Sequence, residues 1–296
     1  MKRITSRSQR TLADAVPICG RGLVTGRPIR LRLLPARPDT GLIFHRVDLA
    51  HRPTIPALAE GVTGTARRTT IGSPLSQVTL TEHILAALAG MRIDNCILEL
   101  DGPEPPSIDG SALAFVQAIE SVGAVTQSAR RPILTPTEPL TVRAGNAAIV
   151  LHPSEEPGLK ISYLLDYGLG SPIPPQVSTW EIDPQTFRHQ LAPCRTFVLD
   201  REAQELLRQG VGRHLTHSEL LVFDDRGVKG NTLRFADEPA RHKILDLVGD
   251  LALSGVDLAG HAVAVRSGHP LNVEMSKLIR TRMGVAESFL PQRRAA

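Results

Sequence analysis

Three side chains in the stretch Ala240–Leu251 have types and a spacing that suit metal binding. His242, Asp246 and Asp250 follow one another at intervals of four, and no proline interrupts the leucine-type residues around them. The pattern predicts a helix on which these three share one arc with Gly249, whose missing side chain leaves room. An imidazole and a carboxylate one turn apart can bind the same divalent cation. An isolated pair of this kind is more often a solvated polar face, so other parts of the chain must decide.

A second helix, predicted over Thr79–Gly90, begins with a similar group. Glu82 and His83 lie near its start and point away from its apolar face. The run Glu-His-Ile-Leu-Ala-Ala-Leu here is similar to Arg-His-Lys-Ile-Leu-Asp-Leu around His242, and a turn and a strand follow each run. This weak internal repeat predicts two like domains whose helix starts face each other across a cleft, the usual place for a ligand site.

The composition is that of a globular protein with a sizeable core. Of the 296 residues, 42% are hydrophobic and 22% are charged, which suits two domains. Aromatic residues make up only 3% and the formal net charge is only +4, so we expect no nucleic-acid partner. A phosphorylated small molecule is compatible with this charge.

Cysteine usage and hydropathy favour the cytoplasm. The three cysteines are scattered, without a C-x-x-C pair, which argues against a disulfide framework or a cysteine zinc site and suits a reducing compartment. No apolar run follows the basic residues near Met1, so we expect no signal peptide. No apolar run approaches the roughly 20 residues needed to span a bilayer. We therefore expect a cytoplasmic protein with at most peripheral membrane contact.

Apolar periodicity and turn-forming residues divide the chain into two parts. In the first part, Gly20–Gly26 is a predicted turn, strands are predicted over 29–33, 42–47 and 93–100, and helices over 79–90 and 111–121. In the second part, strands are predicted over 140–142, 148–152, 160–165, 219–223 and 260–265, and helices over about 200–209, 240–251 and 272–282. Arg130–Pro136 is interpreted as a linker, which gives domains of residues 1–128 and 129–296. Residues 266–270 are a predicted loop, and residues 287–296 a predicted frayed tail.

Ordered motifs along most of the chain resemble those of one enzyme family. They are Gln9-Arg-Thr-Leu with Gly20-Arg-Gly-Leu, Asp39-Thr-Gly-Leu-Ile-Phe, Thr81-Glu-His-Ile-Leu-Ala-Ala-Leu-Ala-Gly, Ile108-Asp-Gly-Ser-Ala, Arg195-Thr-Phe, Arg241-His-Lys-Ile-Leu-Asp with Gly249-Asp, and Ser267-Gly-His. With these motifs, the sequence from about Gln9 to Arg282 is similar to the UDP-3-O-acyl-N-acetylglucosamine deacetylase family, the zinc enzymes of bacterial lipid A synthesis. So many motifs in order are far more specific than any one of them.

The resemblance implies an α+β fold of two similar α/β sandwich domains, each a sheet packed with two helices, with the active site between the domains. It implies zinc as the cofactor, with ferrous iron as an alternative, and UDP-3-O-acyl-N-acetylglucosamine as the substrate. We expect a monomer. Carried over to this sequence, the metal ligands are His83, His242 and Asp246, the catalytic residues are Glu82, His269, Thr196 and Asp250, and the substrate-binding residues are Lys243 and Phe197.

These residue types suit the hydrolysis of an amide. Two imidazoles and one carboxylate leave one position on a tetrahedral zinc for water, whose pKa falls from 15.7 towards roughly 7. Glu82 precedes the ligand His83, and because adjacent helical residues diverge by about 100° it suits proton transfer better than metal binding. Thr196 and a His269 kept protonated by Asp250 can donate to the oxyanion, and losing one such donor typically costs about 10²–10³ in rate.

The sequence departs from the family pattern at two places. Val24 stands where the family usually has His in the glycine-rich turn. Residues 213–219, which include His214 and His217, stand where the family often has a Gly-Gly-Ser-Leu-Asp-Asn type run beside its acyl-chain passage. We expect Val211–Leu221 to form the wall of that passage and the preferred acyl chain to differ. The histidines other than His83, His242 and His269 are interpreted as non-ligands.

Two other functions stay open. Two histidines and one carboxylate also suit non-haem Fe(II) oxygenases, but these need no base beside a ligand, so Glu82 favours hydrolysis. A non-catalytic homologue that binds a nucleotide sugar or an acyl chain would be marked by a lost ligand or base. No such residue is lost in this sequence.

Overall fold

The structure is a computed structural model that describes residues 1–284, and its elements form two halves with the same sheet topology. In each five-stranded sheet the first two strands form a hairpin, and the strand after the first long helix is inserted in the centre, parallel to the third strand. In order across each sheet, the strands are β2 (Val16–Arg21), β3 (Pro28–Pro35), β9 (Cys96–Leu100), β4 (Leu42–Arg46) and β5 (Thr54–Pro56) in the first half, and β11 (Leu140–Ala144), β12 (Ala147–His152), β19 (Gly260–Val265), β13 (Leu159–Leu165) and β14 (Gln176–Glu181) in the second. The shared order confirms the predicted internal repeat.

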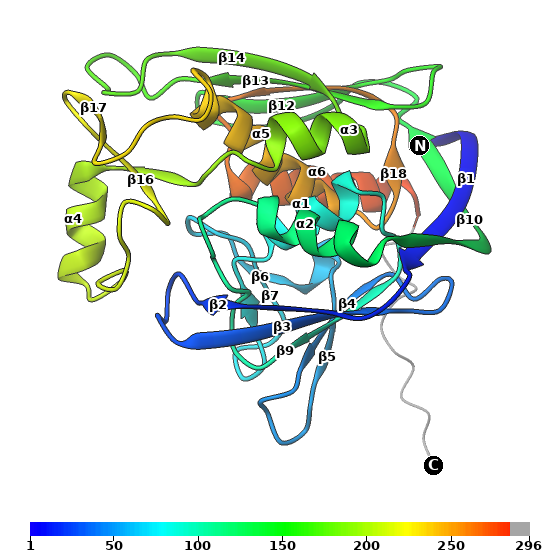
Figure 1. Cartoon of the computed structure of the whole chain (residues 1–296). Helices are drawn as coiled ribbons and strands as arrows, with labels where there is room; N and C mark the ends of the chain where they lie inside the picture. The colour runs from blue at the N-terminus through cyan, green and yellow to red at the C-terminus, as the bar shows by residue number, and fades with distance from the viewer. Residues whose placement is uncertain (285–296) are drawn as a thin grey trace.

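Two long helices from each half fill the space between the sheets. They are α1 (Glu82–Gly90) and α2 (Leu113–Val122) in the first half, and α5 (Glu238–Ala252) and α6 (His269–Arg282) in the second. Figure 1 shows the resulting layers from top to bottom: sheet, helices, helices, sheet. Helices α1 and α5 pack against each other in the middle. This architecture confirms the predicted α+β class.

Helix α5 is buried on nearly all sides, not only on its leucine face. The three residues on its polar arc are almost completely buried: His242, Asp246 and Asp250 are 1%, 2% and 0% exposed. The alternative of a solvated polar face is therefore wrong, because α1 and α6 cover this arc. Ionisable side chains this deeply buried need partners to offset the loss of hydration.

The close crossing of α1 and α5 depends on Gly249. A Cβ at this position would lie 2.0 Å from the carbonyl oxygen of Glu82 and 2.8 Å from its carbonyl carbon. Both atoms belong to the backbone, so they cannot rotate away as a side chain would. The room that the sequence predicted beside Gly249 is occupied by the first turn of α1, which touches α5 there.

We expect Gly249→Ala to destabilise the fold and to weaken the site carried by α1. Overpacking an interior contact typically costs about 1–3 kcal/mol of unfolding free energy, and a backbone clash belongs at the upper end. The gain of about 1 kcal/mol in helix propensity is smaller. Urea unfolding measures the difference. Gly61→Ala is a control, because a Cβ there would meet its nearest atom, Pro56 O, only at 3.6 Å. Equal losses in the two variants would contradict the close-contact explanation.

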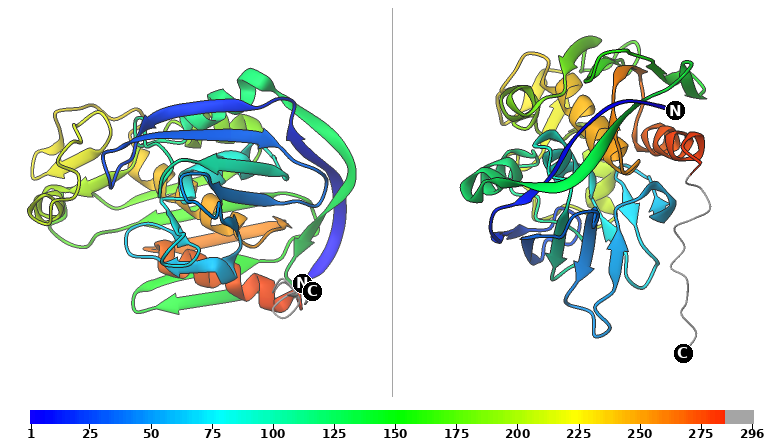
Figure 2. Two further views of the ribbon diagram at one scale, coloured as in Figure 1. Left: turned by 90° about the horizontal axis from the view of Figure 1, so that it is seen from below. Right: turned by 90° about the vertical axis from the view of Figure 1, so that its right-hand side faces the viewer.

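A further sheet joins the halves along one side of the molecule, as Figure 2 shows. Its strands are β1 (Lys2–Leu12), β10 (Ala124–Thr135) and β18 (Asp257–Leu258). Arg7 donates to Asp94 Oδ1 at 2.7 Å in the first half and to Asp257 Oδ2 at 2.6 Å in the second. Most of the predicted linker Arg130–Pro136 is thus strand, because its backbone pairs with residues 2–8 at the start of the chain. The predicted boundary near residue 128 falls within β10 and stays a proposal.

In each half, an insert separates the edge strand of the sheet from the first long helix. It lies between β5 and α1 in the first half and between β14 and α5 in the second. The first insert contains η1 (Ala59–Gly61), β6 (Val62–Gly64), β7 (Thr70–Ile71) and β8 (Val78–Thr79). The second contains α3 (Pro184–Thr186), η2 (Phe187–Leu191), β15 (Phe197–Leu199), α4 (Asp200–Arg208), β16 (Leu221–Asp224) and β17 (Gly227–Lys229). Helix α4 with β16 and β17 projects at the left of Figure 1.

Residue His269, predicted in a loop, is the first residue of α6. Pro270 follows it in the first turn, where proline is favoured because its missing N–H would have no helical partner. The predicted frayed tail, residues 287–296, lies outside the described residues. Within residues 1–284, no helix combines the length and the apolar character needed to cross a membrane.

Candidate active site

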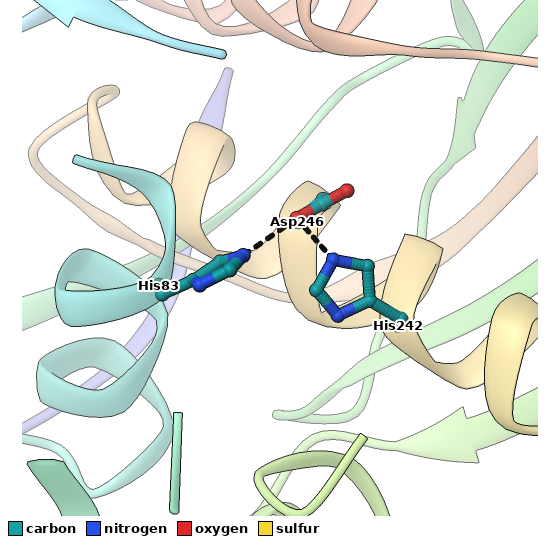
Figure 3. Close-up of side chains that lie close together, drawn as sticks. All are labelled: His83, His242 and Asp246. Carbon is teal, nitrogen blue, oxygen red and sulfur yellow. Dashed lines mark ion pairs between the residues drawn. The ribbon is translucent and has the colours of Figure 1, made fainter. Parts of the chain in front are cut away.

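Three side chains from two helices converge where α1 crosses α5 (Figure 3). His83 comes from the first turn of α1, and His242 and Asp246 come from successive turns of α5. The Nε2 atoms of His83 and His242 lie 3.5 and 3.4 Å from Asp246 Oδ1, and the three ligand atoms lie within 4.8 Å of one another. Among the described residues, Asp246 Oδ1 has no hydrogen-bond partner although it is buried.

This donor set fits a divalent cation such as zinc. Two atoms bound to one zinc ion at about 2.1 Å in tetrahedral geometry are about 3.4 Å apart, close to the separations found here. A buried carboxylate oxygen without a partner is costly, and a cation among the three groups would supply one. Imidazole nitrogen and carboxylate oxygen are donors that zinc and other first-row metals bind. The residues present therefore fit a bound metal ion.

Neighbouring groups hold the cluster in a form that can bind metal. The Nδ1–H of His242 donates to the carbonyl oxygen of Cys194 at 3.0 Å, which leaves Nε2 free as a ligand. Burial lowers the pKa of His242 to about 3, so its imidazole is neutral, as a metal ligand must be. Lys243 donates from Nζ to Asp246 Oδ2 at 2.7 Å, which leaves Oδ1 facing the histidines.

A second cluster lies beside the first and is centred on His269. Its Nδ1–H donates to Asp250 Oδ2 at 2.8 Å, and its Nε2 faces Glu82 Oε1 at 3.8 Å. Asp250 also accepts hydrogen bonds from Thr69 Oγ1 at 2.6 Å and Asn272 Nδ2 at 2.9 Å. Burial alone would lower the pKa of His269, but the Asp250 carboxylate outweighs it and raises the pKa to about 9. The ring therefore carries a proton at neutral pH.

Glu82 stands between the two clusters. It precedes His83 on α1 and is only 2% exposed. Its Oε2 accepts the backbone N–H of Thr69 at 3.0 Å, while Oε1 faces His269. Burial raises the pKa of Glu82, although His269 and His83 partly oppose this. A carboxylate with a raised pKa beside a metal cluster is suited to accept a proton.

Both clusters open into a cleft of about 750 Å³ that the two halves line together. The residues predicted from the sequence that line it are Glu82, His83, Thr196, Phe197, His242, Lys243, Asp246 and His269. The remaining predicted residue, Asp250, lies behind His269 and holds its ring. The structure thus brings every sequence-predicted site residue to one place.

A buried ion pair holds Thr196 at the cleft. The preceding residue, Arg195, donates from Nε to Glu238 Oε1 at 2.8 Å, and Glu238 is the first residue of α5. The backbone N–H of Thr196 donates to the carbonyl oxygen of Gly110 at 2.8 Å, in the first half. Because both halves bind this segment, its position and that of the Thr196 hydroxyl are fixed relative to the two clusters.

An apolar pocket of about 320 Å³ opens beside the cleft. Thr196, Phe197 and Leu220 line both cavities, so the two are continuous. Helix α4 and the predicted wall segment Val211–Leu221 supply much of the pocket, through Ala203, Leu206, Leu207, Val211 and Leu215. At the junction, Lys243 Nζ lies 5.4 Å from the Phe197 ring centroid, within the range of a cation–π contact.

Comparison with known families decides the relationship of this chain. The family model for LpxC, UDP-3-O-acyl N-acetylglycosamine deacetylase, matches residues 9–281. The chain belongs to this family. Relatives named UDP-3-O-acyl-N-acetylglucosamine deacetylase include one from Chlamydia caviae, 40% identical over 274 residues, which are 92% of this chain and 97% of the relative. One from Geotalea uraniireducens is 39% identical over 266 residues (89% and 85%), and one from Nostoc sp. is 38% identical over 276 residues (92% and 98%).

Membership of the deacetylase family confirms the resemblance found in the motifs.

Two further residues at the site, Thr69 and Asn272, are not predicted from the sequence. Thr69 binds Asp250 with its hydroxyl and Glu82 with its N–H, yet it lies in a short insert without periodic pattern that could mark it. Asn272 also binds Asp250. It follows His269 by three positions, so a helix predicted to begin at His269 would have placed both side chains on one face.

Proposed function

We propose that this chain hydrolyses the N-acetyl amide of UDP-3-O-(3-hydroxyacyl)-N-acetylglucosamine and releases acetate, as a zinc-dependent amidohydrolase of lipid A biosynthesis. The proposal is carried by one observation: a cluster that fits a metal, a carboxylate and a charged histidine share a cleft that continues into an apolar pocket. Family membership and the names of the relatives support the same reaction.

Zinc is the proposed cofactor, and His83, His242 and Asp246 would hold it. When bound, it would lower the pKa of a water molecule towards about 7 and polarise the amide carbonyl. Ferrous iron fits the same two histidines and one carboxylate. An oxygenase needs no carboxylate base beside a ligand, so Glu82 favours hydrolysis with either metal.

Glu82 and His269 would carry out the proton transfers. One oxygen of Glu82 is held by Thr69, so the other is free to accept a proton from the attacking water. Protonated His269 would donate to the amide nitrogen as the carbon–nitrogen bond breaks, which yields acetate and an amine. Asp250 orients His269 and keeps it charged, and the Thr196 hydroxyl would donate to the oxyanion.

The two cavities suit the two ends of the proposed substrate. Lys243 places a cation in the cleft, where the diphosphate of a UDP sugar needs one. The apolar pocket beside Phe197 suits the acyl chain, because each buried methylene contributes about 0.8 kcal/mol. A chain of about ten methylenes would contribute several kcal/mol, part of which can orient the amide for attack.

We predict a strong preference for the 3-O-acylated over the unacylated sugar, with an unusual chain-length optimum. The measurement is kcat/KM across acyl lengths from zero upward, with products identified by mass spectrometry. Chimeras that exchange Val211–Leu221 with a relative should move the optimum without changing zinc content. A flat series, with the unacylated sugar as good as the rest, would contradict the substrate assignment.

We predict a bell-shaped dependence of kcat/KM on pH, because Glu82 must be ionised while His269 is protonated. Burial raises the pKa of Glu82, so the acidic limb lies above the usual glutamate range. The pKa of His269 is raised to about 9, so activity falls as pH rises through the basic limb. A bound cation adds positive charge and moves both limbs to lower pH. Asp250→Asn should lower the basic limb by about 1–3 pH units, and an unchanged limb would remove Asp250 from this role.

A non-catalytic homologue that binds a nucleotide sugar or an acyl chain is the second candidate. Retention of both histidines, Asp246 and Glu82 disfavours it, and product analysis separates the two because a binding protein releases no acetate. We also propose a cytoplasmic monomer. The three free cysteines suit a reducing compartment, and one chain supplies every residue of the proposed site.

A further inference from the structure

His214 fastens one wall of the apolar pocket to the other. Its Nε2–H donates to the carbonyl oxygen of Gly22 at 2.9 Å, which joins the segment between α4 and β16 to the glycine-rich turn Gly20–Gly26. The ring also packs on Gly26, where a Cβ would lie 2.6 Å from His214 Nδ1. The contact therefore uses both a hydrogen bond and a close approach that only glycine permits.

The residues on either side of this contact line the pocket, although His214 itself does not. Val211 and Leu215 flank His214 on one wall, and Leu23 and Val24 belong to the turn on the other. The two places where the sequence departs from the family pattern, residue 24 and residues 213–219, thus lie next to the same contact. His214 therefore joins the two walls of the pocket at one point.

The glycine-rich turn is the rigid partner of this contact. The backbone N–H groups of Val24 and Thr25 donate to the carboxylate of Glu104 at 2.9 and 2.7 Å, and Glu104 is fully buried. A Cβ at Gly22 would lie 2.2 Å from Glu104 Oε1, so the carboxylate fills the inside of the turn. A buried, charge-assisted pair of hydrogen bonds of this kind fixes the turn in place.

The segment 209–220 is held less firmly. Its side-chain hydrogen bonds other than that of His214 are local, such as Thr216 to Glu219, or run to Asn231 within the second half. Among residues 1–284, the bond from His214 is the one hydrogen bond that joins this segment to the first half. Near the end of the segment, the carbonyl oxygen of Glu219 also packs against Gly110, where a Cβ would lie 2.2 Å from it. Nearby, Arg67 pairs with Glu202 of α4 at 3.2 Å, outside this segment. Both side chains are substantially exposed, so the pair contributes little stability.

We propose that His214 is a positioning residue that determines acyl-chain selectivity by holding segment 209–220 against the glycine-rich turn. This inference rests on the proposed function, because it assigns the pocket to the acyl chain. With the walls held together, each added methylene is fully buried, and kcat/KM should rise by about fourfold per methylene until the pocket is full. Longer chains should then gain nothing or lose.

Removal of the ring should loosen the wall and flatten this dependence. The test is kcat/KM of H214A over a series from unacylated sugar to 3-hydroxyoctadecanoyl sugar. We expect the slope of log kcat/KM per methylene to fall at least about twofold, because a loose wall leaves each methylene partly hydrated. The longest chains should no longer be disfavoured, and kcat on the unacylated sugar should be unchanged.

Two variants separate this role from a general loss of folding. H214Q should restore the steep slope, because its amide N–H reaches about as far as the imidazole Nε2. G26A should flatten the slope from the opposite side of the contact, because a Cβ there would displace the His214 ring and because the φ of +66° at Gly26 strains any residue other than glycine. H189A is the control for an exposed histidine outside both cavities.

Hydrogen exchange supplies a readout that does not depend on activity. Amides of residues 209–220 should exchange faster in H214A and G26A than in the wild type or H214Q. A wild-type length profile in H214A, or an equal loss at every length including zero, would overturn the inference. If the wild type releases no acetate from any of these sugars, the proposed function fails, and unchanged exchange in H214A would separately show that His214 does not hold the segment.

Discussion

Replacing Glu82 by Gln is expected to lower kcat by at least about a hundredfold while the protein keeps its metal. The amide of Gln has nearly the shape of the carboxylate and can still accept the Thr69 N–H that now binds Oε2 at 3.0 Å. It cannot take a proton at neutral pH, so the attacking water would lose its base. His83, the next residue, keeps its position on α1, and metal binding should persist.

The measurement is kcat on an acylated UDP sugar together with metal content and urea unfolding of the same preparation. Glu120→Gln is the matched control. Glu120 lies on α2, away from the cleft, and pairs with Arg188. A near-normal kcat for Glu82→Gln would remove Glu82 from the mechanism. Loss of metal in this variant would instead make Glu82 a determinant of the metal site.

The double variant His83→Ala, His242→Ala is expected to lose bound metal and activity together. Asp246 would be left as the one remaining member of the cluster, and one carboxylate oxygen is a weak site for zinc. Mutating the two helices at once also tests that α1 and α5 share a single ion, as their convergence on Asp246 Oδ1 at 3.5 and 3.4 Å indicates.

Metal analysis of the folded double variant decides this prediction. His152→Ala, His189→Ala is the control, because both of these histidines are exposed and lie outside the cleft. We expect one metal ion per chain in the wild type and the control, and none in the double variant. Full occupancy in a well-folded double variant would place the metal elsewhere.

Local patterns were enough to predict the parts of this fold that repeat. His83 and His242 open similar helices followed by similar strands, and the structure shows the same sheet order around both. The sequence predicts room beside Gly249 on the arc of His242, and the structure shows that the backbone of Glu82 occupies it. These features lie within single helices, where side-chain spacing translates directly into direction.

Features that depend on distant partners could not be read from the sequence. The sequence predicts a linker over Arg130–Pro136, because nothing local shows that residues 2–8 pair with it. The burial of Asp250 follows from α6 and Thr69 covering it, and neither is close in sequence. The contact of His214 with Gly22 joins positions 192 residues apart and leaves no periodic trace.

The most direct test of a metal-dependent deacetylase is acetate release by one preparation before chelation, after chelation, and after zinc is added back. The substrate is UDP-3-O-(3-hydroxyacyl)-N-acetylglucosamine, and the metal content of the protein is measured at each stage. We predict that acetate release is lost as the chelator removes the metal from His83, His242 and Asp246. It should return when one equivalent of zinc per chain is restored. Full acetate release by protein shown to be free of metal would contradict the assignment.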